Sequence, residues 1–305
     1  MSLLIVGTVG LDTVETPFGK KSDILGGSSV YAAISASFFS AVSIVSVIGE
    51  DFKSEDFDFL RKQKINLDSI AVLPGKTFRW SGFYEFDMDQ AHTKGTDLNV
   101  LMQFDPVLSD KDKKASFVFL ANLDPDIQLK IIDQLEAPKM IGADTMDFWI
   151  KNKKDSLIKV ISKVDLLFIN EGEIRMLVGT PNIPKAAKEL LKLGVKTVIV
   201  KKGEHGALVF TNDSYFALPA YPQEIFQDPT GAGDSFAGGL FGYIAKKREI
   251  SFKNMKNGIV FGSIMASFNI EDFSFERMKS LTNNDILNRA KEFHLFSSFD
   301  PLVEI

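Results

Sequence analysis

The chain has 305 residues, of which 45% are hydrophobic and 25% are charged, and it contains no cysteine. These proportions are those of a globular protein, and the missing cysteines exclude disulfides, thiolate catalysis and cysteine-bound zinc. The net charge of −5, without a basic stripe, argues against nucleic acid as the main partner.

No apolar run approaches the roughly 18 residues that a membrane-spanning helix needs. The apolar stretch at residues 3–7 is too short for a secretory signal, and it lacks a basic start. We therefore expect a cytoplasmic protein without a membrane partner.

The first predicted element is a strand at residues 3–7, because a short, continuous apolar run is typical of a strand buried on both faces. It leads to Asp12, at or just beyond the carboxyl end of that strand. Ligands bind at this end of open parallel sheets. Asp12 is therefore a candidate ligand-binding residue, although a turn would also explain it.

Gly26 and Gly27 precede an Ala- and Ser-rich stretch at residues 30–39 that predicts a helix. The glycine pair would let a ligand approach the backbone, or it would simply form a turn. Residues 42–48 predict a second buried strand, and residues 53–64 predict an amphipathic helix.

Residues 77–101 differ in character, because aromatic and polar residues alternate along the first part of this segment. A period of two predicts a half-exposed antiparallel strand, in a sheet separate from the buried one. We expect a small lid formed by residues 11–25 and 77–101. Arg79 and Asn99 are the polar lid residues expected to contact a ligand.

From residue 116 onward, strand patterns alternate with helix patterns. The predicted strands lie at residues 117–121, 140–143, 166–169, 197–200 and 207–210. The predicted helices lie at residues 126–135, 155–162, 172–178, 184–193, 235–247, 252–268 and 283–293. This alternation predicts an α/β fold with a doubly wound, mostly parallel sheet flanked by helices. With no internal repeat or linker, we expect one domain over residues 1–305, with a small β-sheet lid.

Two sites after predicted strands are candidates for nucleotide binding. Asn170 and Glu173 would face phosphates and the hydration shell of Mg²⁺, which takes carboxylates and keeps several waters; a capping box at a helix start would look the same. Lys201, with Gly203 and Gly206 after it, offers a charge and a close backbone approach, although a plain β-hairpin turn has the same residues.

The segment at residues 228–235 carries the strongest chemical signal. Gly231 and Gly233 lie at the start of a predicted buried helix, where unpaired N–H groups and the helix dipole favour an anion, above all a phosphate. A carboxylate in such a place repels phosphate. Asp234 is therefore interpreted as a general base that takes the proton from an alcohol as its oxygen attacks a terminal phosphate. The alternative for Asp234 is an N-cap residue.

Two other phosphate motifs do not fit. Gly75-Lys76-Thr77 resembles the end of a Walker A loop, but Ile70 stands where its first glycine belongs. Gly231 and Gly233 begin like a dinucleotide fingerprint, but Phe236 replaces the third glycine. An NAD(P)-binding oxidoreductase is therefore a minor alternative.

Taken together, the chain resembles the ribokinase-like, or PfkB, family of carbohydrate and nucleoside kinases. The motifs that carry the resemblance are Gly26-Gly27, residues 49–52, Asn170-x-x-Glu173, Gly203-x-x-Gly206 and, above all, residues 228–236. Their order and spacing cover about residues 3 to 270. The resemblance implies an ATP-dependent kinase that uses Mg²⁺ and has a β lid, which often forms a dimer contact.

The resemblance also implies roles for particular residues. It makes Asp234 the base. The matched positions then divide into four groups: an anion hole at Gly231, Ala232 and Gly233; an ATP and Mg²⁺ site at Asn170, Glu173, Lys201, Gly203, Gly206 and Gly258, with Glu173 acting on Mg²⁺ through water; an acceptor site at Asp12, Gly26 and Gly27; and, in some members, a monovalent cation such as K⁺ at Asp228 and Thr230.

One position departs from the family pattern. Tyr31 stands where many sugar-binding members have Asn, and a phenol cannot copy the donor and acceptor of an amide. We expect Tyr31 at the acceptor site and a kinase that phosphorylates the hydroxymethyl group of a small sugar or sugar-like compound. The alternative is an adenosine-like nucleoside kinase of the same fold, and a non-catalytic ligand sensor is a further one.

Overall fold

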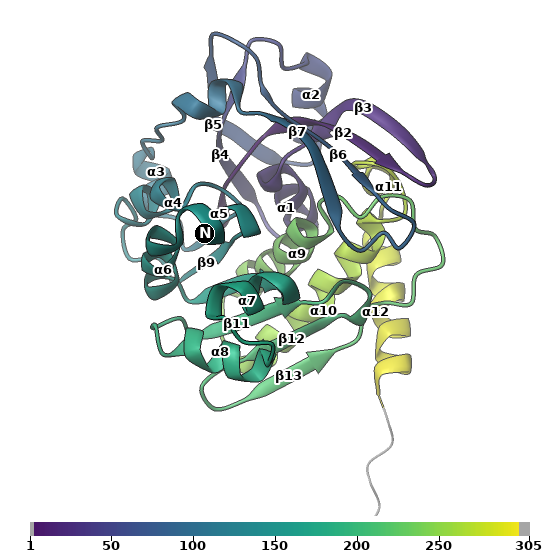
Figure 1. Cartoon of the computed structure of the whole chain (residues 1–305). Coiled ribbons are helices and arrows are strands. Elements are labelled where there is room, and N and C mark those ends of the chain that lie inside the picture. Colours follow the sequence, from purple (N-terminus) through teal and green to yellow (C-terminus); the bar gives the residue numbers. More distant parts are fainter. Residues whose placement is uncertain (1–2, 299–305) are drawn as a thin grey trace, which may run out of the picture.

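The computed structural model of the chain describes residues 3–298 (Figure 1). A nine-stranded sheet runs through the molecule in the order β13-β12-β11-β10-β9-β8-β1-β4-β5. Its strands are β1 (Leu3–Val6), β4 (Val42–Gly49), β5 (Ile65–Leu73), β8 (Phe117–Leu120), β9 (Met140–Asp144), β10 (Leu166–Asn170), β11 (Thr197–Lys201), β12 (Ala207–Phe210) and β13 (Tyr215–Leu218).

Every neighbouring pair from β11 to β5 is parallel, and only the β11–β12 and β12–β13 pairs are antiparallel. The predicted fold class, a doubly wound and mostly parallel α/β sheet, is confirmed. Because all these parallel strands run in one direction, their carboxyl ends lie along the same edge of the sheet, where ligands bind in such folds.

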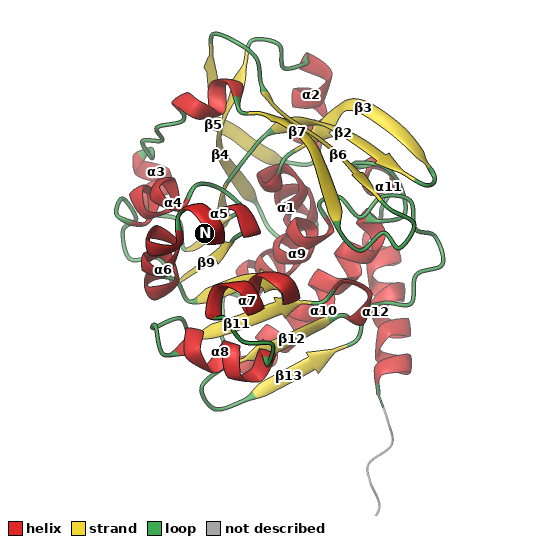
Figure 2. Cartoon of the chain, in the orientation of Figure 1, coloured by secondary structure: helices red, strands yellow, loops and turns green. Residues whose placement is uncertain are grey.

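Helices cover both faces of the sheet (Figure 2). In β1, Leu3 and Ile5 join one hydrophobic core, whereas Leu4 and Val6 join the other, because successive side chains of a strand point to opposite faces. The first core is completed by α1 (Ser28–Ser37), α2 (Ser54–Lys62), α9 (Ala232–Lys247), α10 (Phe252–Asn269), α11 (Glu276–Lys279) and α12 (Asn283–Ser297). The second is completed by α4 (Pro125–Ile132), α5 (Asp147–Asn152), α6 (Lys154–Lys163), α7 (Glu171–Val178) and α8 (Ile183–Leu191), and the short α3 (Asp110–Lys113) precedes β8.

A second sheet of four strands, in the order β3-β2-β6-β7, forms the lid. It consists of β2 (Gly10–Thr16), β3 (Gly19–Gly26), β6 (Phe78–Tyr84) and β7 (Ala91–Asp97), and the 3₁₀ helix η1 (Asn99–Gln103) follows it. The predicted separate sheet is therefore present. Its strand pairing is mixed, since β6 is antiparallel to β7 but parallel to β2.

Two strands of the main sheet were not predicted. β5 and β13 are the edge strands; β5 mixes buried with exposed positions without a regular period of two, and β13 has four residues of which only Leu218 is buried. An edge strand has a neighbour on one side only, so its sequence carries a weaker apolar pattern than that of a central strand.

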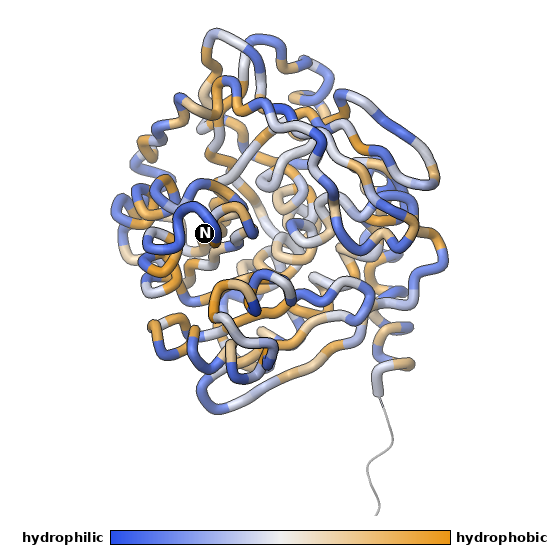
Figure 3. Tube along the Cα trace, in the orientation of Figure 1, coloured by the Kyte–Doolittle hydropathy of each residue, from blue (hydrophilic) through white to orange (hydrophobic). Residues whose placement is uncertain are grey.

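Figure 3 shows the hydrophobic stretches concentrated on the central strands and packed helices, with hydrophilic stretches on many outer loops. Within residues 3–298, no helix is both long enough and apolar enough to cross a membrane.

Candidate active site

Helix α9 begins at the predicted phosphate cradle. Its N-cap is Gly231, with φ of 74°. The ring of Tyr31 lies directly against Gly231, and a Cβ atom there would overlap it. Both the left-handed backbone and this close approach require glycine. The N-cap alternative for Asp234 is excluded, because Gly231 holds that position and no side chain caps the helix.

The first backbone amides of α9 are not all free. Ala232 N donates to the carbonyl of Pro229 at 3.1 Å, so in this structure the Ala232 amide of the expected anion hole already has a partner. The amides of Gly231, Gly233 and Asp234 donate no bond within residues 3–298. Because a first-turn amide has no partner inside the helix, these three amides remain able to bind an anion.

Asp234 lies on the first turn of α9 and is partly exposed. Burial, together with the Asp144 carboxylate, raises the pKa of Asp234 to about 8, and the Lys201 ammonium opposes the rise. A carboxyl group with such a pKa can exchange a proton near neutral pH, as a general base must.

Lys201 and Asp144 form an ion pair beside this turn. Lys201 is the last residue of β11, and Asp144 is the last residue of β9. Lys201 Nζ donates to Asp144 Oδ2 at 2.7 Å. Nζ also lies 3.2 Å from the point that a Cβ of residue 233 would occupy. Although burial lowers the pKa of Lys201, the carboxylates of Asp144 and Glu173 raise it above its ordinary value, so the lysine remains charged.

Asp144 was missed as a candidate from the sequence. It ends an apolar strand at the ligand-binding edge of the sheet, which is the same signal that selected Asp12. Its partner, Lys201, lies 57 positions away in the sequence, so the pairing itself is not visible before folding.

Asn170 and Glu173 form the capping box that was one of the two interpretations. Asn170 N donates to Glu173 Oε2, and Glu173 N donates to Asn170 Oδ1, both at 2.8 Å. Burial raises the pKa of Glu173 to about 7, with Lys201 opposing the rise. Within residues 3–298 no three His, Cys, Asp or Glu side chains form a metal cluster.

The three predicted nucleotide-site glycines have different surroundings. Gly203 and Gly206 flank the turn of an antiparallel β11–β12 hairpin, as the hairpin alternative proposed. Gly203 lies near Asp89 of the β6–β7 loop, whereas Gly206, with φ of 86°, packs against the backbone of Leu218. Gly258 is buried between α10 and α9. Helix packing therefore explains Gly258, and the structure does not bring it to the other candidate residues.

Asp12 is buried on the lid strand β2, beyond the end of β1 where the sequence placed it, and lies next to the predicted glycine pair. A Cβ atom on Gly26 would overlap the Asp12 carboxylate. Burial, together with the neighbouring Asp228 carboxylate, raises the pKa of Asp12 to about 7, while the backbone of Gly27 opposes the rise. The absence of a side chain on Gly26 thus makes room for this acid.

Asp228, Thr230, Tyr31 and Tyr84 complete this side of the site. Thr230 N donates to Asp228 Oδ1 at 2.9 Å, and the Thr230 and Tyr84 hydroxyls are 3.3 Å apart. Within the described residues, Asp228 Oδ2 and the Tyr31 hydroxyl are buried without a partner. A buried carboxylate oxygen in that state needs a proton or a cation, so the residues present fit the predicted monovalent ion.

Arg79 and Asn99 make contacts at the base of the lid. Arg79 NH1 lies 2.8 Å from Asp51 Oδ2, and Asn99 Nδ2 donates to the Thr77 carbonyl at 3.0 Å. Thr77 Oγ1 donates in turn to Asp51 Oδ1 at 2.7 Å. The structure does not bring Arg79 or Asn99 to Asp12 or Asp234, and it gives both side chains a place in the connection between lid and main sheet.

A carboxylate beside unpaired amides at a helix start, next to a charged lysine, is an arrangement suited to phosphoryl transfer. Residues 24–277 match the model of the pfkB family carbohydrate kinase, and the chain belongs to this family. It is a kinase whose acceptor is an alcohol group, as predicted, and the oxidoreductase and sensor alternatives are set aside.

Named relatives and solved structures agree with this assignment. A cytidine kinase from Thermococcus kodakarensis is 32% identical over 255 residues, covering 80% of this chain and 88% of the relative. The structure of a Methanocaldococcus jannaschii nucleoside kinase matches with a TM-score of 0.76 and 20% identity, over 95% of this chain and 98% of that one. An Arabidopsis thaliana ribokinase complexed with ribose and ATP also matches, with a TM-score of 0.76, 19% identity and the same coverage. At these identities the two structures establish the ribokinase-like fold.

Proposed function

We propose that this kinase transfers the γ-phosphoryl group of ATP to the hydroxymethyl group of a nucleoside. The sequence favoured a free sugar and kept a nucleoside as the alternative. The similarity to a cytidine kinase over 80% of the chain supports the alternative better. The fold is shared with a nucleoside kinase and with a ribokinase, so the fold does not choose between the two acceptors.

The observation that carries the chemistry is the position of Asp234 beside the free amides of α9 and the Lys201–Asp144 pair. Asp234 takes the proton of the hydroxymethyl group as its oxygen attacks the phosphoryl group. The amides of Gly231, Gly233 and Asp234, with Lys201, stabilise the charge on the migrating phosphoryl group.

The nucleotide would bind at the ends of β10 and β11, where Asn170, Glu173, Lys201, Gly203 and Gly206 are positioned. When bound, Mg²⁺ neutralises charge on the phosphates of ATP, and Glu173 would hold it through water. For Gly258 we retain only an indirect role, through the packing of α10 on α9.

The acceptor would bind at Asp12 and at the backbone of Gly26 and Gly27. Within residues 3–298 no lysine or arginine forms an ion pair with Asp12, so its acceptor oxygens suit hydroxyl donors such as those of a ribose. The ring of Tyr31 packs against Gly231 next to this region. Arg79 and Asn99 would act on the acceptor indirectly, by holding the lid in place.

A homodimer through the lid is a further proposal. Phe18 and Phe86 lie on lid loops and are 56% and 93% exposed, and exposed aromatic side chains are common at protein interfaces. Sedimentation of the chain and of a Phe18→Ser, Phe86→Ser variant tests this; a monomeric parent chain would refute it.

The experiment that tests the proposed function is ADP release with ATP, Mg²⁺ and a panel of cytidine, uridine, adenosine, inosine, ribose and fructose. We expect turnover with at least one nucleoside and a kcat/KM at least about tenfold higher than with either sugar, because a base adds binding contacts. Turnover confined to the sugars would refute the nucleoside assignment and restore the carbohydrate one. The Asp234→Asn variant, which lacks the proposed general base, serves as the inactive control.

A further inference from the structure

The carboxyl ends of β8 and β9 carry a polar and aromatic cluster that the phosphoryl transfer does not use. It consists of Asn122, just after β8, and Met146, Phe148 and Trp149, in and before α5. Trp149 Nε1 donates to Asn122 Oδ1 at 2.9 Å, and Asn122 Nδ2 lies 3.1 Å from Met146 Sδ. In Figure 1, α5 lies to the left of α1 and α9, and the lid strands lie to the upper right of it.

The indole fixes the orientation of the Asn122 amide. An indole N–H can only donate, so it must face the amide oxygen, and the NH₂ group must therefore point the other way. The partner on that side is a thioether sulfur, which is a weak acceptor. The NH₂ group has two donors, and within residues 3–298 this sulfur is its one hydrogen-bond partner. The amide thus presents donors that a ligand can accept.

Aromatic surface adjoins this amide. Phe148 is 50% exposed, and its ring meets that of Trp149 edge to face with centroids 4.8 Å apart. Trp149 and Asn122 are both partly exposed. A flat ring with polar edges can stack on such side chains while the amide donates to one of its edges, which is how proteins read single bases.

The cluster is joined to both halves of the proposed site. Ser28 Oγ donates to the Asn122 carbonyl at 3.2 Å, and Ser28 begins α1 directly after Gly26 and Gly27. On the other side, Met146 follows Asp144 by two positions on the same chain segment, and Asp144 pairs with Lys201. The cluster thus adjoins the chain segments that carry the glycine pair and the Asp144–Lys201 pair.

We propose that Asn122, held in one orientation by Trp149, selects the base of the acceptor by donating to a carbonyl or ring nitrogen on its edge. The rings of Trp149 and Phe148 supply the stacking surface. The inference rests on the proposed nucleoside acceptor and names the residues that would recognise its base. It makes Asn122 a specificity-determining residue without a part in the phosphoryl transfer.

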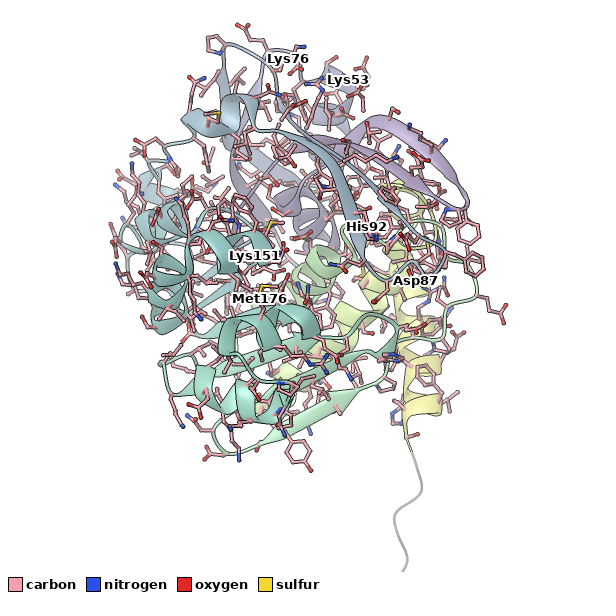
Figure 4. The ribbon with its side chains drawn as sticks, viewed as in Figure 1. Lys53, Lys76, Asp87, His92, Lys151 and Met176 are labelled. Carbon is pink, nitrogen blue, oxygen red and sulfur yellow. The ribbon has the colours of Figure 1, made fainter. Side chains whose placement is uncertain are left out.

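Figure 4 shows the side chains in the same orientation as Figure 1. In Figure 4, Lys151 of α5 and Met176 of α7 lie on one side of the centre, and Asp87 and His92 of the β6–β7 hairpin lie on the other. In this view α5 and the β6–β7 hairpin thus lie on opposite sides of the centre of the molecule.

The test compares kcat/KM for cytidine, uridine, adenosine and inosine in the parent chain and in Asn122→Asp, which replaces the NH₂ donor by an acceptor of the same shape. We expect the preferred nucleoside to lose about tenfold or more, since a site built around a hydrogen bond rejects a mismatched partner strongly. The preference among bases should change, while KM for ATP stays within about twofold of the parent.

Trp149→Phe is the second variant, since it keeps a stacking ring and removes only the indole donor. It should weaken the discrimination among bases by about threefold or more, because the Asn122 amide is then free to rotate and exchange the positions of its oxygen and NH₂ group. The matched control is Asn283→Asp at the exposed start of α12, which should leave every ratio unchanged. Thermal unfolding shows whether each variant is folded. If Asn122→Asp does not fold, the result for Trp149→Phe decides whether Asn122 selects the base.

Two outcomes are distinct. If the parent phosphorylates no nucleoside, the proposed function fails. If it phosphorylates nucleosides and both folded variants keep the parent's ratios among the four bases within about twofold, the proposed function stands and Asn122 is not the base-selecting residue.

Discussion

The two halves of the site differ in charge. On the β9–β11 side, Lys201 is enclosed by the carboxylates of Asp144 and Glu173. On the lid side, Asp12 and Asp228 face each other and the phenols of Tyr31 and Tyr84, and within residues 3–298 no cation pairs with them. A cation suits the phosphates of ATP, whereas unpaired acceptor oxygens suit the hydroxyl groups of a neutral acceptor. Asp234 stands between these halves, since both Asp144 and Asp12 act on its charge.

The largest effect should come from removing the group that serves both halves. Asp234→Asn should lower kcat by about 10² or more, because general bases typically contribute that much. The KM for ATP and for the acceptor should change little. Steady-state ADP release measures all three constants, and near-normal turnover of the variant would remove Asp234 from the mechanism.

A substitution in the acceptor half of the site should weaken use of the acceptor without weakening the binding of ATP. Asp12→Asn should lower kcat/KM for the acceptor by about tenfold to a hundredfold, as expected for a lost hydrogen bond to a charged group, with the KM for ATP retained. Asp213→Asn, on an exposed turn, is the matched control. An equal loss in both KM values would contradict the division of the site into two halves.

The nucleotide half should give the reverse pattern. Lys201→Gln should raise the KM for ATP about tenfold, because a charge-assisted contact is lost, and should leave the KM for the acceptor within about twofold. Lys202→Gln removes the neighbouring lysine, which lies 3.6 Å from Glu171 near the surface. If the two variants behave alike, the position of Lys201 beside Gly233 has no special importance.

Stability should follow the raised pKa of Asp234. The folded chain keeps the proton on this carboxyl up to about pH 8, whereas the ordinary value is 3.8. Between these values unfolding releases a proton, so the free energy of unfolding falls as pH rises. Asp234→Asn removes this dependence. Its Tm should exceed that of the parent at pH 8 by about 2 °C or more, and the difference should shrink toward pH 4 in thermal scans.

The smallest effect should come from the contact between the lid and the α9 loop. Tyr84→Phe removes the hydroxyl that lies 3.3 Å from Thr230 Oγ1. It should raise the KM for the acceptor by about fivefold or less, the worth of one neutral hydrogen bond, without affecting the KM for ATP. Tyr215→Phe, on the exposed edge strand β13, is the control. If only the KM for ATP rises, the contact belongs to the nucleotide half of the site and the prediction is wrong.

Much of the fold was predictable because its signals are local. The central strands are continuous apolar runs, and the helices that cover them carry apolar residues at helical spacing, so their positions follow from periodicity. The segment at residues 228–236 likewise holds its turn, glycines and acid within nine neighbouring positions. By itself, the sequence thus determined the central strands of the sheet, the lid segments and the choice of Asp234 as the candidate base.

The partners of these residues were decided only by the tertiary structure. Lys201 meets Asp144 across 57 positions, and Tyr84 meets Thr230 across 146. The same holds for the Tyr31 ring under Gly231, the Pro229 carbonyl that occupies the Ala232 amide, and the Asp51 contact that draws Arg79 to the lid base. Each depends on side-chain directions and distances that are fixed when strands far apart in the chain are brought to one edge of the sheet.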